Sequence, residues 1–260
     1  MHSAARRLFV ALDFPDAASA LAMAERLAPL GVGFKVGLEL FTAEGPDLLR
    51  RLANTAPASP IFLDLKFHDI PATVAGAVRS ASRLGASLMN LHLTGGEAMV
   101  RAALAARDEA MASAASPEKS KAEDSSARRD EADGRPRLIG VTVLTSLDGE
   151  DLRRVWGDTA GGDASAHALR LARLAREWGL DGVVASAQEA AAIRTACGPE
   201  FLIVTPGIRP AGAAAGDQKR TLTPAAAMAA GASHLVVGRP VTQAANPNHA
   251  CRELLLEIRN

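Results

Sequence analysis

The stretch Asp64-Leu65-Lys66-Phe67-His68-Asp69-Ile70-Pro71-Ala72-Thr73 follows the strand-like run Pro60-Ile61-Phe62-Leu63. Residues two apart in a β-strand share a face, so Asp64 and Lys66 are expected to point the same way. Pro71 ends the extended segment, and Thr73 is predicted to cap a helix whose apolar residues follow the helical period. Charges at the carboxyl end of a strand, directly before a helix, lie where α/β proteins keep their active sites. A surface salt bridge at a loop entrance is the alternative for this pair, because exposed pairs are common and individually weak.

The same strand-then-helix pattern occurs eight times along the chain. Apolar runs that predict the strands cover residues 8–13, 32–37, 60–63, 86–92, 138–144, 182–185, 201–205 and 233–237. Continuous apolar strands that alternate with helices indicate a parallel sheet covered by helices. At this length we predict closure into a single-domain (β/α)₈ TIM barrel over residues 1–260. A doubly wound open sheet is the alternative, but no Gly-x-Gly-x-x-Gly lies at a strand-to-helix turn.

One segment interrupts this pattern, from about residue 108 to residue 137. It is rich in Ala, Ser and charged residues and has almost nothing large and apolar after Met111. Such a segment cannot offset its ordering entropy by burial. We therefore predict a mobile charged insertion between the fourth helix and the fifth strand, at the barrel end opposite the strand carboxyl ends. For its first few residues, an extension of the preceding helix is the alternative.

The charge balance and the cysteine count limit the possible partners and compartment. The chain has 29 Lys and Arg residues against 29 Asp and Glu residues, which argues against nucleic acid as the main partner. Two cysteines, Cys197 and Cys251, make neither a disulfide framework nor a metal-type spacing. No apolar run approaches the ~20 residues needed to span a bilayer, and Asp13 interrupts the first apolar run too early for a signal peptide. We expect a cytoplasmic protein without a membrane partner.

Four charged residues fall at or near the carboxyl ends of the first three strands: Asp13, Lys35, Asp64 and Lys66. Consecutive strands of a barrel are neighbours, so these side chains are expected to converge on one cavity. A lysine inside a buried strand, such as Lys35, is costly unless it is paired or reaches water. Alternating cations and carboxylates keep each other ionised. Asp69, in the following loop, is expected to fold back or to reach across a subunit boundary. A structural salt-bridge network is the alternative for the cluster.

A second group of candidate residues lies after the last two predicted strands. Thr205-Pro206-Gly207-Ile208-Arg209-Pro210 follows the seventh strand, and Val237-Gly238-Arg239 closes the eighth. Loops at these positions of a barrel often hold a phosphate. Gly238 lets the backbone approach an anion, while Arg209 and Arg239 offer charge-assisted hydrogen bonds. The small-residue loop 211–216 suits a lid over a ligand. An ordinary exposed turn is the alternative.

The motif from Asp64 to Thr73 and the two segments after the seventh and eighth strands closely resemble the orotidine 5′-phosphate decarboxylase family. Two further segments share the resemblance: Val141-Thr142-Val143-Leu144-Thr145-Ser146 and Asp217-Gln218. The resemblance covers the whole chain except about 108–137, and the Asp-x-Lys-x-x-Asp-Ile-Pro-x-Thr pattern is its most specific part. It implies loss of CO₂ from orotidine 5′-monophosphate to give UMP, the last step of de novo pyrimidine nucleotide synthesis. It also implies that no metal or organic cofactor takes part, and that the enzyme is a homodimer of barrels.

The resemblance assigns catalytic roles at the motif. Lys66 resembles the proton donor to C6 of the pyrimidine, and Asp64 would lie beside the leaving carboxylate. Lys35 would bridge the carboxylates and the ribose. Asp69, together with Thr73, would enter the active site of the other subunit.

The resemblance also assigns substrate-binding roles. Asp13 would hold a ribose hydroxyl, and Thr145 and Ser146 would contact the pyrimidine. The phosphate-binding positions are Arg209, Gln218, Gly238 and Arg239. For His68 and His92, which lie near the cluster, we expect structural roles.

Two other functions are compatible with parts of this pattern. A Mg²⁺-dependent sugar-phosphate decarboxylase or aldolase-like synthase resembles the Asp-x-Lys-x-x-Asp segment, although the Ile70-Pro71-x-Thr73 continuation and the loop 205–209 favour the orotidine 5′-phosphate decarboxylase. A non-catalytic nucleotide-binding barrel is the other alternative, and the intact Lys66 argues against it. Turnover that is insensitive to a chelator separates the first two functions, and tight UMP binding without turnover would indicate the third.

Overall fold

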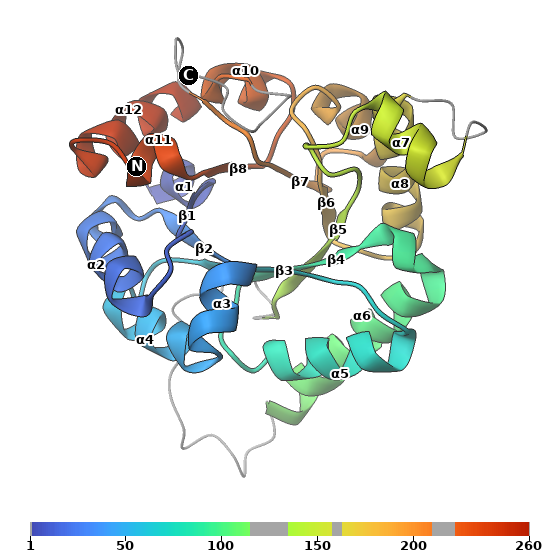
Figure 1. Cartoon of the computed structure of the whole chain (residues 1–260), viewed down its shortest axis with the longest axis horizontal. Helices are drawn as coiled ribbons and strands as arrows, with labels where there is room; N and C mark the ends of the chain where they lie inside the picture. Colours follow the sequence, from blue (N-terminus) through green and yellow to red (C-terminus); the bar gives the residue numbers. More distant parts are fainter. Residues whose placement is uncertain (1, 115–134, 158–162, 210–221, 260) are drawn as a thin grey trace.

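The eight strands form a closed parallel barrel in the order of the sequence (Figure 1). The computed structural model describes residues 2–114, 135–157, 163–209 and 222–259. β1 pairs with both β2 and β8, which closes the ring. The strands are β1 (Leu8–Ala11), β2 (Gly33–Gly37), β3 (Ile61–Phe67), β4 (Leu88–His92), β5 (Arg137–Val141), β6 (Gly182–Val184), β7 (Leu202–Thr205) and β8 (His234–Val237). The predicted single-domain (β/α)₈ TIM barrel is confirmed.

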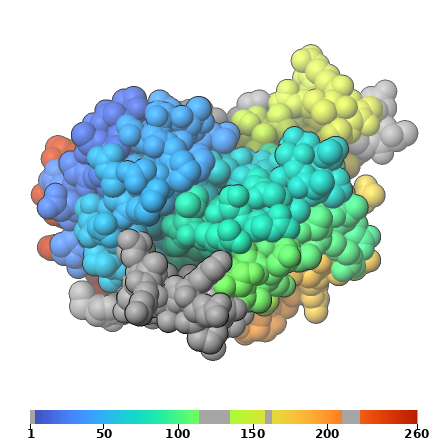
Figure 2. Space-filling view, turned by 90° about the horizontal axis from the view of Figure 1, so that it is seen from below, coloured from blue at the N-terminus to red at the C-terminus, as the bar shows by residue number. Residues whose placement is uncertain are grey.

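Helices cover the outside of the barrel (Figure 1). They are α1 (His2–Arg6), α2 (Ala17–Leu27), η1 (Ala28–Leu30), α3 (Leu38–Glu44), α4 (Asp47–Thr55), α5 (Pro71–Ala81), η2 (Leu93–Gly95), α6 (Gly96–Ala114), α7 (Gly149–Trp156), α8 (Ala164–Glu177), α9 (Ala190–Cys197), α10 (Pro224–Ala229), α11 (Arg239–Thr242) and α12 (Pro247–Arg259). α3 follows the carboxyl end of β2 and α7 follows that of β5, and Figure 2 shows both helices, in blue and yellow-green, on the upper side of the molecule. We call this side the mouth and the opposite end the floor.

Alternate residues along each strand pack into two apolar layers, as the strand period requires. In β1, Leu8 and Val10 join the large cluster between the barrel and its helices. Phe9 and Ala11 join a smaller cluster with Phe62, inside the barrel. The interior is therefore filled with side chains below the mouth, and this packing fixes the strand ends that carry the polar residues.

The helix after β3 begins earlier than the sequence pattern suggested. α5 starts at Pro71, with Ile70 as the preceding cap residue, so the prediction that Thr73 caps this helix was wrong. Proline suits the first helical position because its missing N–H would have had no helical partner there. Thr73 is an exposed residue of the first turn.

The segment predicted as an insertion is helical at its start. α6 continues to Ala114, so residues 108–114 extend the preceding helix, and β5 begins at Arg137. Residues 115–134 lie outside the described part of the chain, so the mobile insertion stays a prediction. Residues 210–221, which include Gln218 and the predicted lid, also lie outside it. No helix in the described ranges has the length and apolar character needed to cross a bilayer.

Candidate active site

Lys66 lies where β3 departs from regular strand geometry. Leu63 pairs with Met89 and Phe67 pairs with Leu91, so the residues between them bulge relative to β4. Within the bulge Lys66 has φ +50°, and it is the one non-glycine residue with positive φ in the described chain. A lysine rarely adopts this left-handed conformation, and strained backbone of this kind concentrates at functional sites. The bulge therefore marks Lys66 independently of its charge.

The four predicted charges form one continuous chain of ion pairs. The Lys66 ammonium lies 2.7 Å from Oδ1 of Asp64, and the Lys35 ammonium lies 3.4 Å from Oδ2 of the same residue. Lys35 also donates a hydrogen bond of 3.0 Å to Oδ1 of Asp13. Lys35 and Asp64 are only 9% and 8% exposed, whereas Asp13 reaches solvent. The structure thus pairs the buried lysine, as the cost of an unpaired buried charge requires.

The Asp64 carboxylate remains ionised despite its burial. Burial alone would raise the pKa of Asp64, but the charges of Lys35 and Lys66 and the hydrogen bonds from Lys66 and Asn90 oppose it. The net effect is a pKa below the ordinary value of 3.8. Asp64 is therefore a fixed negative charge that holds two ammonium groups at the mouth.

Two residues that were not predicted from the sequence support the chain of ion pairs. Asn90, fully buried in β4, donates a hydrogen bond of 2.7 Å to Oδ1 of Asp64. Gly37 leaves room for the Lys35 side chain, because a Cβ at that position would lie 2.9 Å from Lys35 Nζ. A polar residue inside the apolar run 86–92 was the available signal for Asn90. No local pattern marked Gly37.

A cavity of about 420 Å³ opens beside the ion-pair chain and extends to the ends of β7 and β8. Eight of the predicted site residues line it: Asp13, Lys35, Asp64, Lys66, Thr145, Arg209, Gly238 and Arg239. Pro206 and Gln243 also line it, and neither was predicted as a site residue. The charges of the first three strands and the arginines after the last two therefore face one space.

The rim after β7 and β8 carries two neighbouring guanidinium groups. The pKa of Arg209 is lowered, first by burial and second by the positive charge of Arg239. Arg209 donates a hydrogen bond to the carbonyl of Ile208, which fixes its guanidinium. Two like charges held close together favour an anion between them, because the anion relieves their repulsion. This rim has the charge that a phosphate requires.

Three predicted site residues of the described ranges are not brought to the cavity within one chain. Asp69, Thr73 and Ser146 are exposed and are not among the residues that line it. The Asp69 carboxylate accepts a hydrogen bond of 2.6 Å from the backbone N–H of Ile70. Gln218 lies outside the described residues.

The rings of His68 and His92 contact each other beside the cluster, tilted by 42° with centroids 5.3 Å apart. The pKa of His92 is lowered, first by burial and then by the nearby charges of His68 and Lys66. A neutral His92 adds no further positive charge beside Lys66. The structural role expected for both residues stays a prediction. Across the described ranges, no group of three His, Cys, Asp or Glu side chains is placed to hold a metal ion.

Comparisons with known proteins point to one family. The family model described as the orotidine 5′-phosphate decarboxylase / HUMPS family matches residues 6–254. An orotidine 5′-phosphate decarboxylase from Moorella thermoacetica is 49% identical over 252 residues, which cover 97% of this chain and 92% of that protein. One from Alkalilimnicola ehrlichii is 50% identical over 97% of this chain and 96% of its own length. The crystal structure of orotidine 5′-phosphate decarboxylase from Lactobacillus acidophilus has a TM-score of 0.77 and 32% identity, and covers 98% of this chain and 100% of that one.

Proposed function

Since the chain belongs to the orotidine 5′-phosphate decarboxylase / HUMPS family, it converts orotidine 5′-monophosphate to UMP and CO₂ in pyrimidine biosynthesis, and we propose that Lys66 is the proton donor. One observation carries the proposal. The Lys66 ammonium, held 2.7 Å from Asp64, faces the same cavity as Arg209 and Arg239. A nucleotide whose phosphate binds the two arginines can therefore direct its base toward the lysine.

The reaction breaks the bond between C6 of the pyrimidine and the carboxylate carbon. The electron pair stays on C6, where the ring delocalises it poorly, so the site must stabilise a localised negative charge. The fixed ammonium of Lys66 does so electrostatically and then transfers one proton to C6. The resulting neutral amine recovers its proton from water. Asp64 and Lys35 keep the ammonium in place because both take part in the same ion-pair chain.

The other predicted site residues are proposed to bind the ribose, the pyrimidine and the phosphate of the substrate. Asp13 and Lys35 hold the ribose hydroxyls, and Thr145 and Ser146 contact the pyrimidine. Arg209, Gln218, Gly238 and Arg239 bind the phosphate. Because the phosphate is remote from the bond that breaks, its binding energy serves to orient the base against Lys66.

A turnover assay tests this assignment. Protein treated with a chelator is mixed with orotidine 5′-monophosphate, and the pyrimidine absorbance is followed. We expect full turnover, since every group that the mechanism uses belongs to the chain or the substrate. Activity that disappears with the chelator and returns with Mg²⁺ would contradict the cofactor-independent mechanism. It would favour the metal-dependent alternative.

The active unit is proposed to be a homodimer in which Asp69 and Thr73 reach the partner's cavity. Two features support this: Asp69 and Thr73 are exposed, and the large apolar side chains of Leu38 and Ile70, in the segments that follow β2 and β3, are 55% and 66% exposed. Apolar surface next to polar side chains is typical of a protein interface.

Mixing two inactive variants tests the shared site. A heterodimer of Lys66→Ala and Asp69→Ala chains holds one site with both residues intact. Random exchange of subunits should therefore restore about a quarter of the wild-type activity. If subunits exchange and no activity returns, Asp69 does not act in the partner's site.

A cytoplasmic location is also proposed. Cys197 and Cys251 are both free and buried, which suits a reducing compartment. Fractionation of the source cells, with the protein followed by its activity, would check this.

A further inference from the structure

Asn90 occupies a position where an amide is costly. It lies in the middle of β4, is 0% exposed, and is flanked by the buried residues Met89 and Leu91. It is not among the residues that line the cavity, so it lies behind the reacting groups. A buried amide is destabilising unless both its donor and its acceptor are used. What Asn90 bonds to therefore explains why it is there.

Both ends of the Asn90 side chain bond to the catalytic segment. Its Nδ2 donates a hydrogen bond of 2.7 Å to Oδ1 of Asp64. Its Oδ1 accepts a hydrogen bond of 2.8 Å from the backbone N–H of Lys66. One side chain thus contacts the carboxylate that holds the ammonium and the backbone that carries it.

The hydrogen bond from the Lys66 N–H to Asn90 takes the place of a backbone hydrogen bond between β3 and β4. Leu63 pairs with Met89 and Phe67 pairs with Leu91, so three residues of β3 lie opposite the single residue Asn90 of β4. The ladder is interrupted there, and Lys66 adopts its left-handed conformation within the gap. By accepting the Lys66 N–H, Asn90 supplies the hydrogen bond that the bulge removes and holds the backbone in this conformation.

The carboxylate bond completes a closed ring of contacts. Oδ1 of Asp64 accepts from the Lys66 ammonium as well as from Asn90, while Oδ2 faces Lys35. If the Asp64 carboxylate rotated, it would lose both bonds at Oδ1 together. Asn90 therefore helps to fix the position of Lys66 at two places: at its backbone N–H directly, and at its ammonium through the Asp64 carboxylate.

An amide in this one orientation satisfies both partners of the position. An amide turned the other way would face the Lys66 N–H with a donor and the Asp64 carboxylate with an acceptor, and both contacts would repel. An aspartate offers no donor to Asp64, and an aliphatic side chain offers neither group.

We propose that Asn90 is a positioning residue for the decarboxylation, which sets the place of the Lys66 ammonium through the Asp64 carboxylate and the left-handed backbone of Lys66. This rests on the proposed role of Lys66 as proton donor. Asn90 does not line the cavity in which the nucleotide is proposed to bind. Its loss should therefore affect the chemical step and leave nucleotide binding intact.

The test compares kcat, KM and UMP affinity in Asn90→Ala with those of the wild type. A displacement of the ammonium by a fraction of an ångström to 1 Å should lower kcat by about 10²-fold. The KM for orotidine 5′-monophosphate and the Kd for UMP should change by less than about threefold, because the groups that hold the nucleotide are retained. An unchanged kcat would overturn the proposal. So would a parallel loss of kcat and UMP affinity, which would indicate a general loosening of the site.

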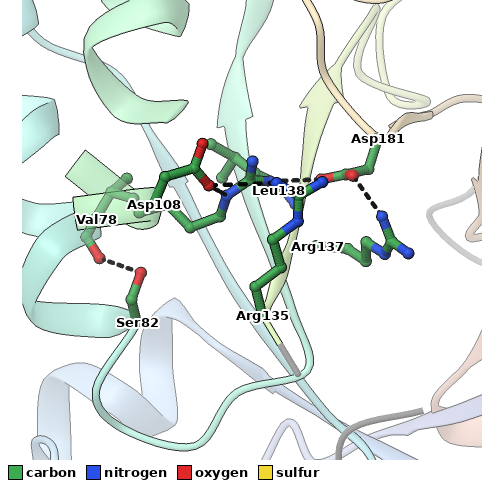
Figure 3. Close-up of polar contacts among 8 residues, drawn as sticks. Val78, Ser82, Asp108, Arg135, Arg137, Leu138 and Asp181 are labelled. Carbon is green, nitrogen blue, oxygen red and sulfur yellow. Dashed lines mark hydrogen bonds and ion pairs between the residues drawn. The ribbon is translucent and has the colours of Figure 1, made fainter. Parts of the chain in front are cut away.

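Two further variants separate positioning from stability. Ser82→Ala removes another buried side-chain hydrogen bond, from Ser82 Oγ to the carbonyl of Val78 at the end of α5 (Figure 3). It should lower the melting temperature and leave kcat unchanged. Asn90→Asp keeps the shape and the acceptor for the Lys66 N–H but directs an oxygen at Asp64. It should lose at least as much kcat as Asn90→Ala, and it serves as the test if the alanine variant does not fold. A wild-type kcat in Asn90→Asp would overturn the proposal.

Failure of this proposal is distinguishable from failure of the proton-donor assignment. If Lys66→Ala is inactive and both Asn90 variants keep the wild-type kcat, only the positioning role is wrong. If Lys66→Ala itself stays active, the proton-donor assignment is wrong.

Discussion

The mouth and the floor of the barrel both carry networks of buried charges, but different cations build them. At the floor, Asp181 precedes β6 and accepts a hydrogen bond of 2.9 Å from Arg137 (Figure 3) and one of 2.7 Å from Arg107. It also accepts one of 2.8 Å from the backbone N–H of Leu138. At the mouth, Asp64 holds two lysines at 2.7 and 3.4 Å.

The difference separates a structural network from a reactive one. A guanidinium has fixed planar donors and does not release its proton in proteins, whereas an ammonium is a compact charge that can release one. Arg107 and Arg137 connect α6 and β5 to the start of β6 through Asp181, on regular backbone. Lys66 lies on strained backbone beside a cavity. Similar distances therefore serve stability at one end of the barrel and chemistry at the other.

Replacing the mouth lysine should give the largest effect. Lys66→Ala removes both the charge that stabilises the carbanion and the proton, so turnover should fall by at least about 10⁴-fold. UMP binding should persist, because the phosphate rim is intact. Steady-state kinetics and a UMP titration measure the two effects.

Lys66→Arg tests the difference between the two cations directly, because it replaces the ammonium at the mouth with a guanidinium like those at the floor. It keeps the positive charge but holds its proton, so it should be nearly as inactive as Lys66→Ala. Substantial turnover in either variant would remove Lys66 as the proton donor.

Breaking the floor network should cost stability without affecting the chemistry. Asp181→Ala removes the buried carboxylate partner of Arg107, whose side chain is 3% exposed, and leaves it the exposed carboxylate of Asp108 at 2.8 Å. Removal of one partner of a buried pair lowers the free energy of unfolding by about 3–5 kcal/mol, and because Asp108 still offsets part of the charge of Arg107 the loss here should not exceed that range. Urea denaturation measures this loss, and kcat per folded molecule should match the wild type. A large fall in kcat with little loss of stability would contradict the structural role of the floor.

The sequence predicted the mouth far better than the floor. Strands and their charged ends are local patterns, so the barrel and the convergence of Lys35, Asp64 and Lys66 followed from runs of a few residues. The floor network joins Arg107 to Asp181 over 74 positions, and neither residue stands out from its surroundings. The capping box of Asp148 and Asp151 at the start of α7 was a local signal, and it was missed.

The irregular backbone at Lys66 could not be predicted from the sequence pattern. The prediction that Asp64 and Lys66 share a face assumed a regular strand, whereas Lys66 has φ +50° in a bulge. Their contact is nevertheless present, because Asn90 supplies the hydrogen bond that the ladder lacks. The bulge depends on packing against β4, and no pattern within residues 60–73 contains that information.

Within the mouth, the phosphate rim should separate binding from chemistry. Arg239→Ala removes charge-assisted hydrogen bonds worth about 1.5–3 kcal/mol, so the KM should rise by about 10- to 100-fold. The loss of affinity should appear for UMP and not for uridine, which lacks the phosphate. Calorimetric titration with both ligands checks this. Equal losses for the two ligands would place Arg239 at the base or the ribose instead.

The smallest expected effect concerns pH and distinguishes the two ends again. His234 is the first residue of β8 and packs against Phe9, with ring centroids 5.8 Å apart. Its pKa is lowered from 6.5 to about 4, first by burial and second by the charge of Arg7. Below pH 6.5 the unfolded chain binds a proton at this histidine, whereas the folded chain does not bind it until about pH 4.

Stability should therefore fall as the pH drops from 6.5 toward 4, by about 2 kcal/mol at pH 5. Urea midpoints at pH 7.5 and pH 5 measure the loss, and His234→Gln should reduce it. At the mouth, the Asp64 carboxylate stays ionised throughout this window because its pKa lies below 3.8, whereas the lowered pKa of His92 adds a loss of the same sign as that of His234. Asp64 instead adds stability that is present above its ordinary pKa and lost only as the pH falls through its lowered one. A wild-type pH dependence in His234→Gln would mean that another group causes the loss above pH 4.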